Sequence, residues 1–211
     1  MENWLEKLKR DRAIAVIRSS SFEVGIQLAK AVAAGGIAQI EITWNSEKPA
    51  QSIEQLRQEL PQCAIGAGTI LDRVQLQEAI AAGAQFLFCP HVNSHLIHEA
   101  NDAGIPIIPG ALSPTEIVAA WQAGATCVKV FPIQAVGGFH YIKALQGPLG
   151  QIPLIPTGGV TFDNAKALID AGAIAVGLSS QLFPPHLVAA RDWDAIAARA
   201  KMGIISVISY Q

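Results

Sequence analysis

Two ionisable residues stand inside otherwise apolar segments of this 211-residue chain. Lys129 lies in the middle of TCVKVF and Glu41 in IAQIEIT, whereas the other lysines and acids fall in helical or loop contexts. A lysine in a dry pocket loses its proton more readily, because burial disfavours the ammonium ion. The neutral amine can attack a carbonyl carbon and form a Schiff base, while a nearby carboxylate moves protons for the same substrate. The alternative is a buried Lys–Glu ion pair that only fixes the register of the core.

The strand period of two indicates where these side chains point. Glu41 shares one face of its run with Gln39 and Thr43, and the isoleucines share the other face. Lys129 shares its face with Phe131. We expect the apolar faces to meet helices, so Lys129 and Glu41 should both point inward, near the carboxyl ends of their strands.

A repeat predicts the elements that position these residues. The dipeptide Ala-Gly closes five amphipathic stretches, with glycines at positions 35, 83, 104, 124 and 172, and an apolar, β-branched run follows each. A glycine past a helix end adopts the left-handed backbone at no steric cost, so each pair predicts helix end, turn and next strand. The predicted strands are AIAVIR (13–18), IAQIEIT (37–43), AIGAG (64–68), FLFC (86–89), IPIIP (105–109), TCVKVF (126–131), IPLIPT (152–157) and AIAVGL (173–178).

Eight strands that alternate with helices, such as FEVGIQLAKAVAA, LQEAIAAG and NAKALIDAG, imply a parallel sheet. Eight such units close naturally into a (β/α)8 TIM barrel, an α/β fold in which catalytic residues lie at the carboxyl ends of the strands. We therefore expect residues 1–211 to form a single barrel domain, with a doubly wound open sheet as the alternative.

Three turns and one arginine are further candidates for binding. The loops at 157–159 and 177–180 follow the last two predicted strands, where barrels often bind phosphate through backbone N–H groups and a helix N-terminus. GAGT at 66–69 ends the third strand with small residues, which either let a ligand approach the backbone or form a plain turn. Arg18 ends the first strand and either pairs with a substrate carboxylate or stays solvated at the rim.

Composition excludes several classes of protein. With 51% hydrophobic and 15% charged residues the chain is not disordered, and 15 Lys+Arg against 17 Asp+Glu argue against nucleic-acid binding. The first twelve residues are charged and lack the apolar segment of a signal peptide, and the charge-free stretch 171–190 holds too many glycines, serines and prolines to span a membrane. The apolar surplus suggests that some surface is hidden in an oligomer.

Cysteine and histidine usage predicts a reduced, metal-free protein. Cys63, Cys89 and Cys127 are odd in number and lie in apolar runs, which indicates reduced thiols and a cytoplasmic location. His91 and His95 are four residues apart, but no third ligand or flanking acid completes a zinc motif. We expect neither a metal nor a cofactor.

In this order the motifs resemble the 2-keto-3-deoxy-6-phosphogluconate (KDPG) / 4-hydroxy-2-oxoglutarate (KHG) aldolase family. The matching strings are AVIR (15–18), EIT (41–43), GAGT (66–69), PH (90–91), KVFP (129–132), PTGGV (156–160) and VGLSS (176–180). The resemblance implies a class I aldolase: a small TIM barrel, a homotrimer, free of metal, acting on a ketoacid that carries a phosphate in some cases. It also implies a place in carbohydrate metabolism, in the Entner–Doudoroff route.

The resemblance assigns roles to individual residues. Lys129 would form the Schiff base and Glu41 would accept and return the proton, which requires its pKa to shift toward the working pH. Thr69 would contact the pyruvate-derived part. The substrate-binding residues implied are Arg18, Thr69, Pro90, Phe131, Thr157, Gly158, Gly159, Ser179 and Ser180, with Gly158, Gly159 and Ser180 at the phosphate.

Two departures from the family pattern leave the substrate open. Many members carry an arginine four residues after the glutamate, where it binds the pyruvate carboxylate, but this chain has Asn45 there and Arg18 is the available substitute. Ser179 stands where relatives often have glycine and would either crowd a phosphate or add a hydroxyl donor. Two other functions stay open: a phosphate-binding barrel isomerase or epimerase, and a non-catalytic barrel that binds a sugar phosphate.

Overall fold

Short parallel strands alternate with helices along the chain. The computed structural model describes residues 3–207, so Met1, Glu2 and residues 208–211, which the predicted domain includes, lie outside the described part. Every predicted strand run contains an observed strand. The strands are β1 (Ala13–Ile17), β2 (Gln39–Thr43), β3 (Ala64–Gly68), β4 (Leu87–Phe88), β5 (Ile107–Ile108), β6 (Gly110–Ala111), β7 (Val128–Val130), β8 (Leu154–Pro156) and β9 (Val176–Leu178).

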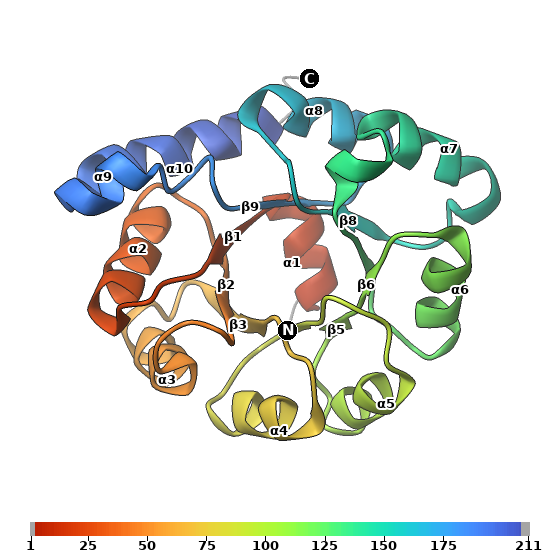
Figure 1. Ribbon diagram of the computed structural model, residues 1–211, viewed down its shortest axis with the longest axis horizontal. Helices are drawn as coiled ribbons and strands as arrows, with labels where there is room; N and C mark the ends of the chain where they lie inside the picture. Colours follow the sequence, from red (N-terminus) through yellow and green to blue (C-terminus); the bar gives the residue numbers. More distant parts are fainter. Residues whose placement is uncertain (1–2, 208–211) are drawn as a thin grey trace.

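The strands form a curled parallel sheet in two sections. Six strands pair in the order β5-β4-β3-β2-β1-β9, and three pair in the order β6-β7-β8. Pro109, which carries no N–H to donate, separates β5 from β6, and its carbonyl accepts a hydrogen bond from Lys129 N–H (2.9 Å). On the other side, Ile174 N–H donates to Leu154 O (3.0 Å) and a bridge joins Thr157 to Gly177. This arrangement is consistent with a TIM-type barrel (Figure 1).

Helices surround the strands (Figure 1). They are α2 (Phe22–Ala34), α3 (Pro49–Glu59), α4 (Arg73–Ala81), α5 (Ser94–Asp102), α6 (Pro114–Gln122), α7 (Phe139–Leu149), α8 (Phe162–Asp170), α9 (Pro185–Ala190) and α10 (Trp193–Val207), with the 3-10 turn η1 (Ile133–Val136) before α7. Many begin at a side-chain cap, as at Ser21, Asp72 and Thr161, where a side-chain oxygen accepts a backbone N–H of the first turn.

The predicted Ala-Gly helix ends are correct at four of the five sites. The glycines at 83, 104, 124 and 172 have φ between +70° and +111°. At the first site the prediction is wrong by one residue: Gly35 has φ −76° and the left-handed turn falls on Gly36, φ +96°. Gly35 serves close packing instead, because a Cβ there would overlap Ala197 O and the Ala200 side chain in α10.

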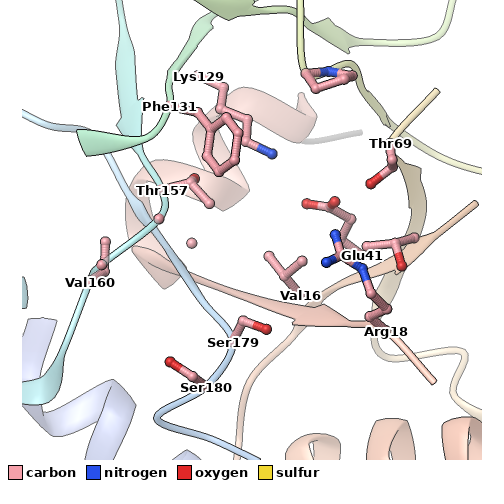
Figure 2. A pocket seen from close by; sticks show the side chains of 15 residues that line it. Val16, Arg18, Glu41, Thr69, Lys129, Phe131, Thr157, Val160, Ser179 and Ser180 are labelled. Carbon is pink, nitrogen blue, oxygen red and sulfur yellow. The ribbon is translucent and has the colours of Figure 1, made fainter. Parts of the chain in front are cut away.

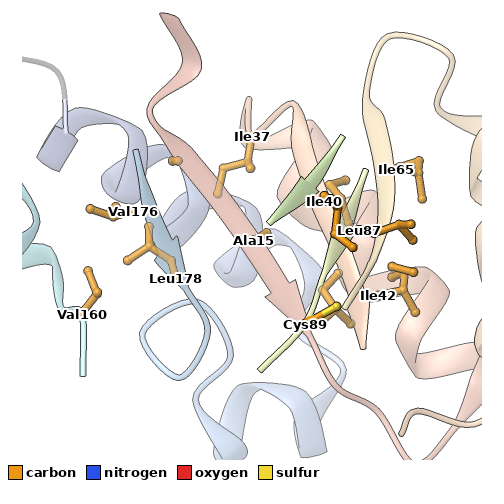
Figure 3. Packing of buried hydrophobic residues seen from close by; sticks show 14 of the residues in the cluster. Ala15, Ile37, Ile40, Ile42, Ile65, Leu87, Cys89, Val160, Val176 and Leu178 are labelled. Carbon is orange, nitrogen blue, oxygen red and sulfur yellow. The ribbon is translucent and has the colours of Figure 1, made fainter. Parts of the chain in front are cut away.

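Two apolar clusters fill the molecule. The larger lies between the strands and the surrounding helices, with side chains such as Ile40, Ile65 and Leu87 (Figure 3). The smaller occupies the interior of the sheet, where Phe86 and Phe88 are buried together with Leu8 of α1 (Trp4–Asp11). Helix α1 thus closes the amino-terminal end of the strands, and chemistry is left to the carboxyl end.

Candidate active site

A cavity of about 420 Å³ lies at the carboxyl ends of the strands (Figure 2). It brings together all eleven residues singled out from the sequence: Arg18, Glu41, Thr69, Pro90, Lys129, Phe131, Thr157, Gly158, Gly159, Ser179 and Ser180. Four more residues line it: Val16 and Val160, which were not singled out, Thr43, which shares the predicted inward face with Glu41, and Gly177, which belongs to the candidate loop at 177–180. The strand period of two carried a signal for Val16 as well, because it stands two residues before Arg18 in the predicted strand at 13–18.

Lys129 projects from β7 into this cavity. Its residue is 7% exposed, and its Nζ lies 5.6 Å from the centroid of the Phe88 ring and 4.9 Å from that of Phe131. Figure 2 shows the amine directed toward Glu41 across the cavity. No direct ion pair joins Lys129 to Glu41 among the described residues. The register-fixing ion pair considered from the sequence is therefore not formed, and the space between the two groups is open to a ligand.

Glu41 projects from β2 and is 1% exposed. Within residues 3–207, its Oε1 has no hydrogen-bond partner. Burial raises the pKa of this carboxyl above its ordinary 4.5, because the carboxylate loses its water, while the positive charges of Lys129 and Arg18 act in the opposite direction. A raised pKa keeps the proton on this carboxyl to a higher pH than on an ordinary glutamate, which suits a group that both gains and loses a proton.

The glycines of β3 make room for side chains of the protein itself. A Cβ on Gly68 would overlap the Glu41 carboxylate, and one on Gly66 would overlap the Phe86 ring. From the sequence, these glycines either let a ligand approach the backbone or formed a plain turn. In the structure the side chains of Glu41 and Phe86 make the close approach. Thr69 follows with φ +60°, a costly value for a β-branched residue, and lines the cavity.

Arg18 lies at the mouth, immediately after β1, and is exposed. Its Nε donates a hydrogen bond to Oδ1 of Asn45 (3.1 Å). Figure 2 shows the guanidinium beside Glu41. Since only one of its five N–H groups is used in this bond, the remainder of the planar fork is available to a carboxylate.

The opposite side of the mouth is polar and small. Exposed Ser179 and Ser180 follow β9, and the loop Thr157-Gly158-Gly159 follows β8. Figure 2 shows the two seryl groups at the side of the cavity away from Thr69. The cavity therefore runs from a buried amine and carboxyl to an exposed, hydroxyl-rich rim.

The other residues considered from the sequence lie outside this cavity. In the described part of the chain, no group of three or more His, Cys, Asp or Glu side chains is placed to hold a metal ion. The three cysteines are free and buried, and burial raises the pKa of Cys63 to about 11 and of Cys89 to about 12. Of the helices within residues 3–207, none is long and apolar enough to cross a membrane.

Comparison with known proteins covers nearly the whole chain. A protein-family model described as "KDPG and KHG aldolase" matches residues 5–199. A 2-dehydro-3-deoxy-phosphogluconate aldolase of Dickeya dadantii (strain 3937) is 32% identical over 208 residues, 97% of this chain and 98% of that protein. A KHG/KDPG aldolase of Escherichia coli (strain K12) is 31% identical over 208 residues, with the same two coverages.

A solved structure is also similar to this one over most of its length. It is a KDPG aldolase from Legionella pneumophila with pyruvate captured at low pH as a covalent carbinolamine intermediate. Its TM-score is 0.87 and its identity 29%, over 94% of this chain and 97% of that one. The likeness in fold therefore extends over nearly the whole of both chains.

Proposed function

Because the chain belongs to the KDPG and KHG aldolase family, we infer that it is an aldehyde-lyase that splits a 2-keto-4-hydroxy acid into pyruvate and an aldehyde. One observation carries the assignment to this cavity. A buried lysine amine and a buried carboxyl with a raised pKa face the same space without forming an ion pair. The substrates considered are KDPG, which yields glyceraldehyde 3-phosphate, and KHG, which yields glyoxylate.

Lys129 is the proposed nucleophile. Its neutral Nζ attacks the C2 carbonyl carbon, and loss of water from the carbinolamine leaves an iminium ion. The rings of Phe88 and Phe131 lie beside Nζ, and the amine itself is almost wholly buried, which supports a nucleophile shielded from solvent. The iminium ion then serves as the electron sink for the next step.

Glu41 is the proposed proton carrier. Through a water molecule it removes the proton of the C4 hydroxyl, and the C3–C4 bond breaks with its electron pair moving toward the iminium nitrogen. The aldehyde leaves, and the resulting enamine takes the proton from Glu41 at C3 before water releases pyruvate from Lys129. The raised pKa of Glu41 supports a group that must be both base and acid.

The two ends of the cavity suit the two ends of the substrate. We assign the pyruvate carboxylate to Arg18, in place of the family arginine that is Asn45 here, with Thr69, Pro90 and Phe131 around the pyruvyl group. The phosphate of KDPG is assigned to the opposite rim, at Thr157, Gly158, Gly159, Ser179 and Ser180. In this assignment the Ser179 hydroxyl is an additional donor.

We also propose the number of barrel units, the oligomeric state, the cellular location and the metabolic route. Counted with β5 and β6 as one strand interrupted at Pro109, the strands make eight units of a (β/α)8 barrel. A homotrimer is supported by exposed large apolar side chains, among them Trp121, Phe139 and Met202. A cytoplasmic location is supported by the three free cysteines, and a place in the Entner–Doudoroff route by the family.

Reductive trapping tests the proposed function. Borohydride added in the presence of pyruvate should attach a reduced pyruvyl group to wild-type protein, and peptide mapping should locate it at Lys129. The Lys129→Met variant should not be labelled and should not cleave KDPG or KHG. An isomerase or a sugar-phosphate sensor would give no adduct, and an adduct on another lysine would overturn the role of Lys129.

A further inference from the structure

The loop after β8 turns its carbonyl groups away from the cavity. Thr157 O accepts from Ile133 N–H (2.9 Å), and Gly158 O accepts from Gln134 N–H (3.1 Å). Gly159 O accepts from Nδ2 of Asn164 (3.0 Å). None of these three donor residues lines the active-site cavity; all three line a separate cavity on the other side of the loop, between η1 and α8.

The opposite side of the last two peptides faces the active site. In a trans peptide the C=O and the following N–H point in opposite directions, so the N–H groups of Gly158, Gly159 and Val160 are directed away from η1 and α8. The bridge between Thr157 and Gly177 places Gly158 N–H against Gly177 O of the neighbouring strand, whereas the N–H groups of Gly159 and Val160 have no hydrogen-bond acceptor among the described residues. Positive φ at both glycines (+84° and +88°) allows this alignment. Two adjacent N–H donors that face the same way form a concave site for an anion.

Only one of the three peptides depends on a side chain. The first two carbonyls are held by backbone donors of η1, whereas the Gly159–Val160 peptide is held by the Asn164 amide. Asn164 also belongs to the α8 capping box: its Oδ1 accepts from Thr161 N–H (2.8 Å), and its own N–H donates to Thr161 Oγ1 (3.2 Å). One side chain therefore links the start of α8 to the orientation of the loop.

We propose that Asn164 is a positioning residue for the phosphorylated substrate. Its Nδ2 fixes the Gly159–Val160 peptide so that Val160 N–H faces the cavity and donates to the substrate phosphate. Asn164 thereby favours phosphorylated over unphosphorylated ketoacids without contacting either. The inference rests on the proposed function, since it requires the phosphate to bind at this rim.

Steady-state kinetics with the two ketoacids test this role. In Asn164→Ala we expect the KM for KDPG to rise about 10- to 100-fold, because a hydrogen bond to a charged group is lost, with kcat nearly unchanged. The kinetic constants for KHG and the trapping of pyruvate by borohydride should stay as in wild type. Equal losses on both substrates, or no loss on KDPG, would overturn the proposal.

A matched variant separates positioning from helix capping. Thr161→Ala removes the other side chain of the same capping box but leaves the Asn164 amide on Gly159 O. It should lower stability without raising the KM for KDPG selectively, and a selective rise would show that capping alone explains Asn164. If Asn164→Ala is unfolded by circular dichroism, Asn164→Asp replaces it. An aspartate keeps the acceptor for Thr161 N–H at a position that favours acids, and lacks the donor to Gly159 O.

The same experiments distinguish failure of the proposed function from failure of the proposed role of Asn164. If wild-type protein forms no pyruvate adduct and cleaves neither ketoacid, the proposed function is wrong. If wild type is active and Asn164→Ala keeps the wild-type KM for KDPG, only the role of Asn164 is wrong.

Discussion

Burial of Glu41 serves activity but lowers the stability of the folded protein. Its pKa is raised chiefly by burial, so the folded state binds the proton more tightly than the unfolded state, whose pKa is near 4.5. As the pH rises from 4.5 to the folded-state pKa, the unfolded state loses its proton first and the protein loses stability by about 1.4 kcal/mol per pH unit.

The Glu41→Gln variant should lack this loss. We expect its free energy of unfolding in urea to exceed that of wild type at pH 7 to 8, and the two curves to converge below pH 4.5. Its kcat should fall about 10²- to 10⁴-fold, because proton transfer is lost. Glu54→Gln, which alters an exposed glutamate of α3, serves as the control. A glutamine variant less stable than wild type at pH 8 would contradict the assigned sign.

Arg18 offers a test of carboxylate binding. In Arg18→Ala the pyruvate concentration that gives half-maximal borohydride trapping should rise about 10- to 100-fold, because a charge-assisted hydrogen bond is removed. Asn45→Ala should produce a smaller rise, since it removes only the acceptor that holds Nε. Unchanged pyruvate affinity in Arg18→Ala would exclude this arginine as the substitute. Arg73→Ala, which breaks a pair with Glu99 on the outer helices, is the matched control.

The sequence predicts some residues of the site better than others. Lys129 and Glu41 could be found because an ionisable side chain in an apolar strand is costly and needs a reason. For Val16 and Thr43 the sequence indicated only which face of the strand they occupy, because an apolar or hydroxyl side chain in a strand can serve many purposes. Asn164 could not be found, because its relation to Gly159 depends on which way a loop carbonyl turns.

At the scale of elements, β3 shows how one strand shapes the group on its neighbour. Gly68→Ala would place a methyl group where the Glu41 carboxylate lies. We expect kcat to fall about 100-fold, as for a misplaced catalytic group, with little change in the circular dichroism spectrum. Gly147→Ala in α7 is the control, because a Cβ there meets nothing within 4 Å, and it should keep wild-type activity. Full activity in Gly68→Ala would show that Glu41 tolerates displacement.

The sequence patterns predicted the helices and strands well, but they failed where contacts between distant elements determine an element's end. Helix α2 coincides with the stretch FEVGIQLAKAVAA, and β3 coincides with AIGAG. The run at 105–109 was predicted as one strand, but Pro109 ends β5 and pairing resumes at Gly110 with another neighbour. The left-handed turn moved from Gly35 to Gly36 because α10 packs there, a contact that no local pattern encodes.

At the scale of the whole molecule, α1 completes the core at the end remote from the active site. Leu8 is 0% exposed in the inner cluster, so Leu8→Ala should lower the free energy of unfolding by about 2–5 kcal/mol. Met202→Ala, at a side chain 53% exposed, should change it by less than about 0.5 kcal/mol. Both variants should keep the wild-type KM for ketoacids while folded. Equal stabilities in urea would show that α1 is not part of the cooperative unit.

The division of the strands into two sections separates the reacting groups. Glu41 belongs to the six-stranded section and Lys129 to the three-stranded one. Their separation is therefore set by the hydrogen bonds across the two junctions, such as Lys129 N–H to Pro109 O and Ile174 N–H to Leu154 O. A small slide of one section against the other would lengthen the path of the proton while every residue kept its local neighbours. The distance over which the proton moves in this protein thus depends on the hydrogen bonds at these two junctions. The rate of amide hydrogen exchange at Ile174 would report how stable one of the junctions is.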